Sequence, residues 1–120
     1  MKTLHLTLKK KWFDLILSGE KVEEYRETKL YWDRRFLDED NSIRKYDYVI
    51  FKNGYSKIAP TIKVEIKNIE LNKGKEEWGA EINKEYYVIY LGKILEVSNI
   101  KSKWDVLIGS KLDEPLKSWD

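Results

Sequence analysis

The sequence contains no cysteine and only one histidine, His5. Without cysteine the chain has no disulfide framework, no thiolate zinc site and no cysteine nucleophile. A single histidine excludes a histidine-rich metal site and catalysis by a pair of histidines. The adjacent glutamates are typical of a solvated surface, and their spacing does not match that of metal ligands. We therefore expect neither a metal nor another cofactor.

The sequence also lacks a long hydrophobic run and a strong excess of one charge. No stretch has the length of a signal peptide's apolar region or of a membrane span, so we expect a soluble, cytoplasmic protein without a membrane partner. The formal net charge is +2, which by itself does not indicate a nucleic-acid partner. The 120 residues fit one compact domain, and hydrophobic residues at 42% of the chain allow a real core.

The first third of the chain predicts a strand, a helix and a second strand. Leu4, Leu6 and Leu8 alternate with polar residues, which is the period of a strand with one buried face. The apolar spacing then changes to that of a helix, with Trp12, Leu15 and Ile16 on one side, which Gly19 ends in a left-handed conformation. Residues 21–27 return to strand character, although they are rich in charge.

The remainder predicts a second helix and three further strands. Thr28 is the predicted cap of a short helix over residues 29–37. Strands are expected over residues 46–53, 60–72 and 86–97, the second with a bulge near Lys67 and Asn68 because its apolar residues change face there. The pattern indicates an α+β fold: a small mixed β-barrel of five to six strands with two short helices near the N-terminus. Residues 1–98 form this domain, and residues 99–120 are expected to be an appendage packed on it.

The charged strand of residues 21–27 is the candidate site. Glu24 and Arg26 point to the same side of an extended chain, and Lys21 follows the glycine turn closely enough to reach them. A guanidinium fork beside a carboxylate binds anions and polar ligand edges well. Alternatively, these residues pair with one another and only hold the first helix to the barrel.

The spacing Gly19, Lys21, Glu24 and Arg26, or G-x-K-x-x-E-x-R, resembles the signature of the ASCH domain family, which belongs to the PUA-like superfamily of β-barrels. The opening "LHLTLKKKWFDLILSGEKVEEYR" is similar to the family's strand, helix, turn and strand. The segments "YWDRRF" and "WGAEINKEYYVIYLGKI" are similar to those of its phage and prophage members. The resemblance spans roughly residues 3–97 and implies a cleft, beside the first helix and the signature strand, that binds RNA or a nucleoside.

Several residues are implied as ligand contacts by this resemblance. They are Lys21, Glu24, Arg26, Trp32 and Arg35, and the end of a strand adds Lys52, Asn53 and Tyr55 as candidates. Arg35 is suited to contact a phosphate and Trp32 to stack on a base. Trp32 has an alternative role, because with Phe36 it makes an apolar helix stripe that would pack in the core.

Whether the protein is an enzyme stays open at this point. Some ASCH proteins are amidohydrolases that deacetylate N4-acetylcytidine with a threonine, the signature lysine and a glutamate. Lys21 matches, but Glu24 stands where those enzymes have the threonine, which removes the presumed nucleophile. Glu24 as general base with Lys21 stabilising an oxyanion is the remaining catalytic hypothesis. Glu76, Glu77 and Glu81 are equally placed to supply the second acid.

A ribonuclease and a protein-interaction domain are also compatible with the sequence. A ribonuclease needs a second proton carrier, and His5, next to core leucines, is expected to be a half-buried structural residue instead. A protein-interaction domain would use exposed aromatic residues, of which the chain has many candidates. The leading prediction is a binding domain for RNA or a nucleotide-like molecule; the oligomeric state is not indicated by the sequence.

Overall fold

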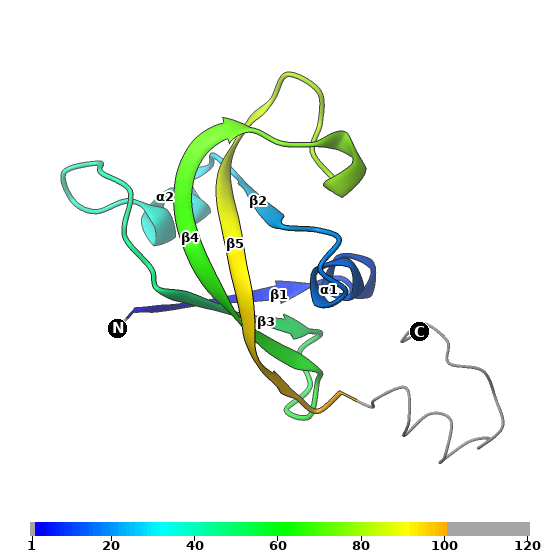
Figure 1. The fold of residues 1–120 in the computed structure, drawn as a ribbon. Helices are drawn as coiled ribbons and strands as arrows, with labels where there is room; N and C mark the ends of the chain where they lie inside the picture. Colours follow the sequence, from blue (N-terminus) through cyan, green and yellow to red (C-terminus); the bar gives the residue numbers. More distant parts are fainter. Residues whose placement is uncertain (1, 101–120) are drawn as a thin grey trace, which may run out of the picture.

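A computed structural model describes residues 2–100 of the chain as a small α+β domain (Figure 1). The elements follow in the order β1 (Thr3–Leu8), α1 (Lys10–Leu17), β2 (Glu23–Glu27), α2 (Leu30–Phe36), β3 (Tyr48–Asn53), β4 (Thr61–Lys73), the 3-10 turn η1 (Glu76–Trp78) and β5 (Glu85–Ser98). The predicted α+β fold with two early helices is confirmed, and five strands lie within the predicted five to six. Most of the predicted appendage at 99–120 lies outside the described residues.

The five strands form one curled, mixed sheet that resembles half of a barrel. Their order is β1-β3-β4-β5-β2, with β1 parallel to β3 and all other pairs antiparallel. The long strands β4 and β5 curve together along their length (Figure 1). The helix α1 connects β1 to β2, the two outer strands of this order. The sheet therefore curls around a core and leaves β1 and β2 as its edges.

Irregular register gives the long hairpin its curvature. The pairing of β4 with β5 shifts between Ile66 and Asn68, at the predicted bulge, and also near Val64. Extra residues in one strand bend it and increase its twist. Ile62, Val64 and Ile66 are buried before the shift and Ile69 after it, so the bulge keeps both sets in the core.

The core is built from the buried face of each element. Leu4, Leu6 and Leu8 of β1 are buried, as their alternation predicts, with Phe13 and Ile16 of α1. A second, aromatic cluster joins Tyr25, Trp78 and Tyr86, with Ala80 and Val88. Apolar burial of this kind is the main stabilising contribution to a small domain.

The beginning of α2 differs from its prediction. Lys29, in an extended conformation, precedes the helix, and no side chain caps it, so the predicted Thr28 cap is wrong. The helix is stabilised instead by contacts with Tyr87 of β5. Phe36 is fully buried and stacks on Tyr87 with the ring centroids 4.7 Å apart, and the Tyr87 hydroxyl donates to Asp33 at 2.5 Å. Tertiary contacts thus replace a local cap.

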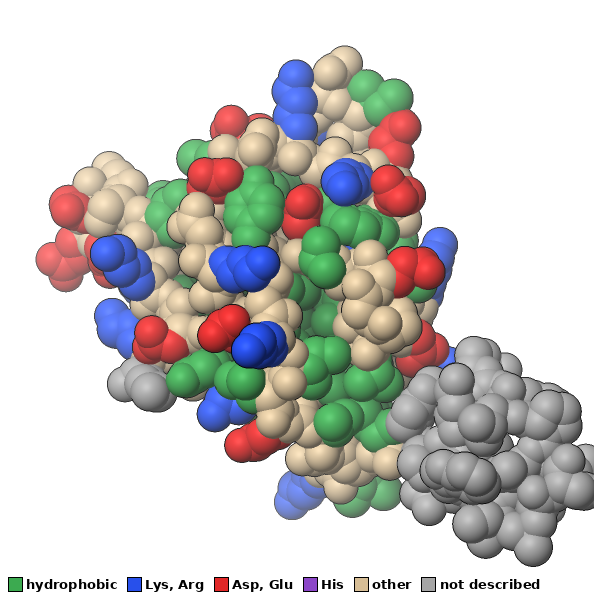
Figure 2. Space-filling view, viewed as in Figure 1, with side chains coloured by type: hydrophobic (Ala, Val, Ile, Leu, Met, Phe, Trp, Pro, Cys, Tyr) green, Lys and Arg blue, Asp and Glu red, His purple; other side chains and the backbone are tan. Residues whose placement is uncertain are grey.

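Charges of both signs are interspersed over the face seen in Figure 2. Such a mixture produces no strong field of one sign across this face. Among the described residues, no helix combines the length and apolar character that crossing a membrane requires.

Candidate functional site

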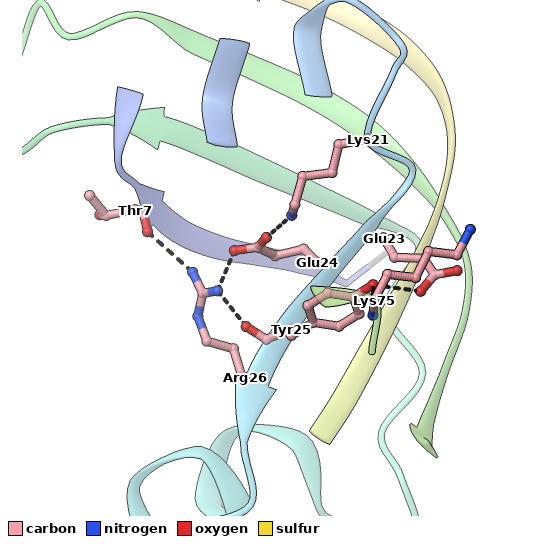
Figure 3. Close-up of polar contacts among 7 residues, drawn as sticks. All are labelled: Thr7, Lys21, Glu23, Glu24, Tyr25, Arg26 and Lys75. Carbon is pink, nitrogen blue, oxygen red and sulfur yellow. Dashed lines mark hydrogen bonds and ion pairs between the residues drawn. The ribbon is translucent and has the colours of Figure 1, made fainter. Parts of the chain in front are cut away.

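The Glu24 carboxylate lies between two cations. One oxygen accepts from the ammonium of Lys21 and the other from the guanidinium of Arg26 (Figure 3). Lys21 is 1% exposed and Glu24 5% exposed, whereas Arg26 is half-buried. Both carboxylate oxygens are therefore paired, and the buried charges form one connected network. The three groups expected to gather do so.

Lys21 reaches this network because the chain turns sharply after α1. Gly19 has φ +84°, and the backbone N–H of Lys21 donates to the Leu15 carbonyl at 2.9 Å. The ammonium then lies 5.5 Å from the ring centroids of both Trp12 and Tyr25. Burial lowers the pKa of Lys21, and the neighbouring Glu24 carboxylate opposes this shift. Lys21 therefore pairs with Glu24 inside the protein, and it does not line the hollow that opens beside Glu24.

A hollow of about 730 Å³ opens in front of Glu24. Its walls carry aromatic side chains from five elements: Trp12 of α1, Tyr25 of β2, Tyr31 and Trp32 of α2, Trp78 of η1 and Tyr86 of β5. Pockets for small molecules often have this size. The lining here is mixed and not largely apolar, because charged side chains, Glu24 and Arg26 among them, share it with the aromatic rings.

Arg26 connects the hollow to the edge of the sheet. Its guanidinium donates to the backbone carbonyls of Tyr25, at 2.8 Å, and Thr7, at 3.2 Å, as well as to Glu24. It also lies 5.1 Å from the ring centroid of Trp32. A guanidinium has five N–H donors in a rigid fork, so these contacts hold its plane in one orientation.

The structure brings five of the predicted ligand residues to the hollow and leaves three outside its lining. Glu24, Arg26, Trp32, Arg35 and Tyr55 all line it. Tyr55 is 89% exposed, at the rim. Lys52 and Asn53, at the end of β3, are half-buried but do not line the hollow, and neither does Lys21.

Trp32 packs on the core, as its alternative role predicted, and also lines the hollow. Its ring lies 6.1 Å from that of Phe36. Arg35 lies 5.9 Å from the ring centroid of Trp32 and 5.2 Å from that of Tyr31. A wall that packs on the core is rigid, which favours stacking on a flat ligand at a small entropic cost.

The three glutamates predicted as candidates for a second catalytic acid are all exposed and absent from the lining of the hollow. They are Glu76, Glu77 and Glu81. The Glu81 carboxylate is 2.9 Å from the ammonium of Lys84, with which it pairs at the surface. The geometry therefore gives none of the three a place beside Glu24.

The prediction for His5 is wrong. His5 is exposed and lines the hollow; it is not the half-buried structural residue expected from its place next to core leucines. The reason is the period of the strand: Leu4 and Leu6 point to the core, so His5 between them points away from it. The alternation itself contains this signal, because closeness in sequence to core leucines does not imply burial on the same face.

The wall made by the turn η1 was not predicted from the sequence. Gly79 has φ +100°, and a Cβ atom at that position would lie 2.9 Å from the Trp12 ring. The close approach requires glycine and sets Trp78 beside α1. The only sequence signal was the Trp-Gly pair in a charged loop, whose contact with a helix far away in the chain is a tertiary property.

Comparison with known proteins finds no similarity that reaches significance: no family model matches the chain, and neither a curated protein nor a solved structure does. Within residues 2–100, no group of three or more histidine, aspartate or glutamate side chains is arranged to hold a metal ion.

Proposed function

We propose that the protein is an ASCH-type, PUA-like binding domain whose hollow receives a nucleobase, either from single-stranded RNA or from a free nucleotide. The observation that carries the proposal is the Glu24–Arg26 pair at one wall of an aromatic hollow. The resemblance of residues 19–26 to the ASCH signature supports it independently of the geometry.

The chemistry of the walls suits a base and its phosphate. Flat aromatic side chains stack on any base, each contributing about 1–3 kcal/mol in single-stranded complexes. A carboxylate and a guanidinium offer an acceptor and a donor to the base's polar edge. Arg35 is exposed on α2 and also in the lining, and this supports the proposal because a guanidinium pairs well with a phosphate.

The test compares two adjacent arginines of α2. Arg35 lines the hollow, whereas Arg34 lines a separate, shallow depression near Asp38. Isothermal titration calorimetry with the four 5′-mononucleotides and an eight-nucleotide single-stranded RNA should show binding that weakens with salt. Arg35→Ala should weaken it roughly five-fold, consistent with loss of a partly screened phosphate contact, and Arg34→Ala should leave it unchanged.

Two results would refute the proposal. One is the absence of binding by every nucleotide and by the RNA at millimolar concentration. The other is an equal effect of the two arginine substitutions, which would show that Arg35 acts only through the overall positive charge of the protein and makes no specific contact. Circular dichroism of both variants controls for folding.

A second candidate function, cleavage of RNA through its 2′-hydroxyl, is favoured by the position of His5. The exposed imidazole shares the hollow with Glu24 and supplies the proton carrier that the mechanism needs. Glu24 would take the proton of the 2′-hydroxyl as its oxygen attacks phosphorus, and His5 would protonate the departing 5′-oxygen. Products ending in 2′,3′-cyclic phosphate, absent with His5→Ala, would support this role; intact RNA after prolonged incubation would exclude it.

Deacetylation and protein interaction have no such support from the geometry. Removal of the acetyl group from N4-acetylcytidine would need Lys21 at the reacting carbonyl, but Lys21 is not in the lining of the hollow. A protein-interaction role would use exposed aromatic side chains, and the two most exposed near the site, Tyr31 and Tyr55, already belong to the rim.

A further inference from the structure

Glu24 keeps part of its hydrogen-bonding capacity unused. A carboxylate has about four lone-pair sites over its two oxygens. Lys21 occupies one site on one oxygen, and Arg26 one site on the other. The two cations approach the carboxylate from opposite sides in Figure 3. Among residues 2–100 no other group donates to Glu24, so each oxygen retains an acceptor site, and Glu24 itself lines the hollow.

Two adjacent acceptors match a ligand edge with two adjacent donors. The Watson–Crick edge of guanine presents such a pair, the N1–H and the N2 amino group. In adenine the amino group stands beside the acceptor N1, and in cytosine beside the acceptor N3. In uracil a single N–H lies between two carbonyl oxygens. A fixed carboxylate therefore forms a bidentate contact with guanine and meets a repelling lone pair on the other three bases.

The charges around the hollow argue against a cationic ligand, which also carries paired donors. Lys9, Arg26 and Arg35 line the hollow together with the carboxylates of Glu24 and Glu27, and the buried ammonium of Lys21 lies behind Glu24. An arginine side chain of a peptide would bring a further positive charge to this surplus. A nucleotide carries a neutral base and an anionic phosphate, and the phosphate is attracted by this positive surplus.

We propose that the hollow is selective for guanine, read by the two free acceptor sites of Glu24. Lys21 and Arg26 are positioning residues in this recognition, because they hold the carboxylate in one orientation, and the aromatic walls hold the base in its plane. This inference rests on the proposed function and adds the identity of the base to it.

Binding of matched nucleotides to the unmodified full chain tests the inference. Isothermal titration calorimetry at pH 7.5 should give GMP an affinity roughly ten-fold or more above AMP, CMP and UMP, since one good bidentate contact discriminates by about that factor. IMP is the sharpest probe, because it differs from GMP only by the missing N2 amino group. It should bind roughly ten-fold more weakly than GMP, and this comparison needs no variant that could fail to fold.

The variant Glu24→Gln turns one acceptor oxygen into a donor. If it folds, as circular dichroism would show, its preference for GMP over IMP should fall to less than two-fold. A free arginine derivative, N-acetyl-arginine amide, is the control for a cationic ligand.

The outcomes separate this inference from the one on which it rests. Nucleotide binding with equal affinities for GMP and IMP, or with another base preferred, would overturn guanine selectivity and leave the nucleobase site intact. Tighter binding of the arginine derivative than of GMP, or no nucleotide binding at all, would overturn both.

Discussion

The guanidinium of Arg26, on β2, donates to the backbone carbonyl of Thr7, on β1, at 3.2 Å. These are the two outer strands of the sheet, and among the described residues they share no backbone pairing. A side chain thus bridges the open seam of the half-barrel, at the same place where the hollow lies. The residue that orients the candidate site also joins the edges of the fold.

Replacing Arg26 by lysine should loosen this seam. Lysine keeps the charge but loses the rigid fork that reaches Thr7 and Glu24 together, at a cost of about 1 kcal/mol in the free energy of unfolding. Hydrogen exchange should become faster in residues 3–8 and 23–27. Arg44→Lys is the matched control, since Arg44 also donates to a backbone carbonyl, that of Leu37. Equal acceleration in these two segments in both variants would contradict the role given to Arg26.

The two sides of the buried ion pair should respond unequally to substitution. Glu24→Ala leaves the Lys21 ammonium buried without its carboxylate, which should cost about 3 kcal/mol. Lys21→Met leaves Glu24 still paired with Arg26 and should cost less, about 1 kcal/mol. Urea unfolding measures both values. A loss from Lys21→Met as large as that from Glu24→Ala would show that the lysine contributes more than its support of Glu24.

Gly79 and Gly54 form a natural pair for separating backbone strain from contact. Their φ angles are +100° and +101°, but a Cβ atom on Gly79 would meet Trp12 at 2.9 Å, whereas one on Gly54 would meet nothing within 4 Å. Gly54→Ala should cost about 1–2 kcal/mol from its left-handed conformation alone. Gly79→Ala should cost about 1–3 kcal/mol more and alter nucleotide binding, because Trp12 must move. Equal costs in urea unfolding would argue against the packing of η1 on α1.

The Tyr87 hydroxyl should make stability depend on alkaline pH. Burial raises the pKa of Tyr87, and its hydrogen bond to Asp33 raises it further. A raised pKa in the folded state means that the neutral phenol stabilises the fold fully below the unfolded pKa of about 10 and progressively less above it. Tyr87→Phe should be about 1 kcal/mol less stable than the natural protein at pH 7. The gap should narrow as pH rises past 10; a constant gap in pH-dependent unfolding would contradict this.

Local patterns predicted the elements well, because each depends on residues close in sequence. Alternation identified β1 and the buried set of β4, and the change of face near Lys67 identified the bulge. The failed Thr28 cap shows the limit of such reasoning. A helix as short as α2 is stabilised by tertiary contacts, here those of Phe36 and Asp33 with Tyr87, and these override the local preference for a cap.

In the candidate site, too, the residues set by a local pattern could be predicted and those set by tertiary contacts could not. The charged strand itself identified Glu24 and Arg26, since same-face neighbours in a strand are two residues apart. Lys52 and Asn53 do lie at a strand end, but the curl of the sheet leaves them outside the lining. The aromatic walls from α1, η1 and β5 could not be predicted, because each reaches the hollow only through contacts between segments far apart in the chain.

By itself, the sequence determined that a lysine, a glutamate and an arginine meet, because a glycine turn and a two-residue period bring them together within eight residues. Only the tertiary structure decided which of them faces the hollow. Packing of Trp12 and Tyr25 around the ammonium buries Lys21, while the open seam between β1 and β2 leaves Glu24 and Arg26 at the hollow. Burial depends on what the rest of the chain places over a residue, and no local pattern contains that information.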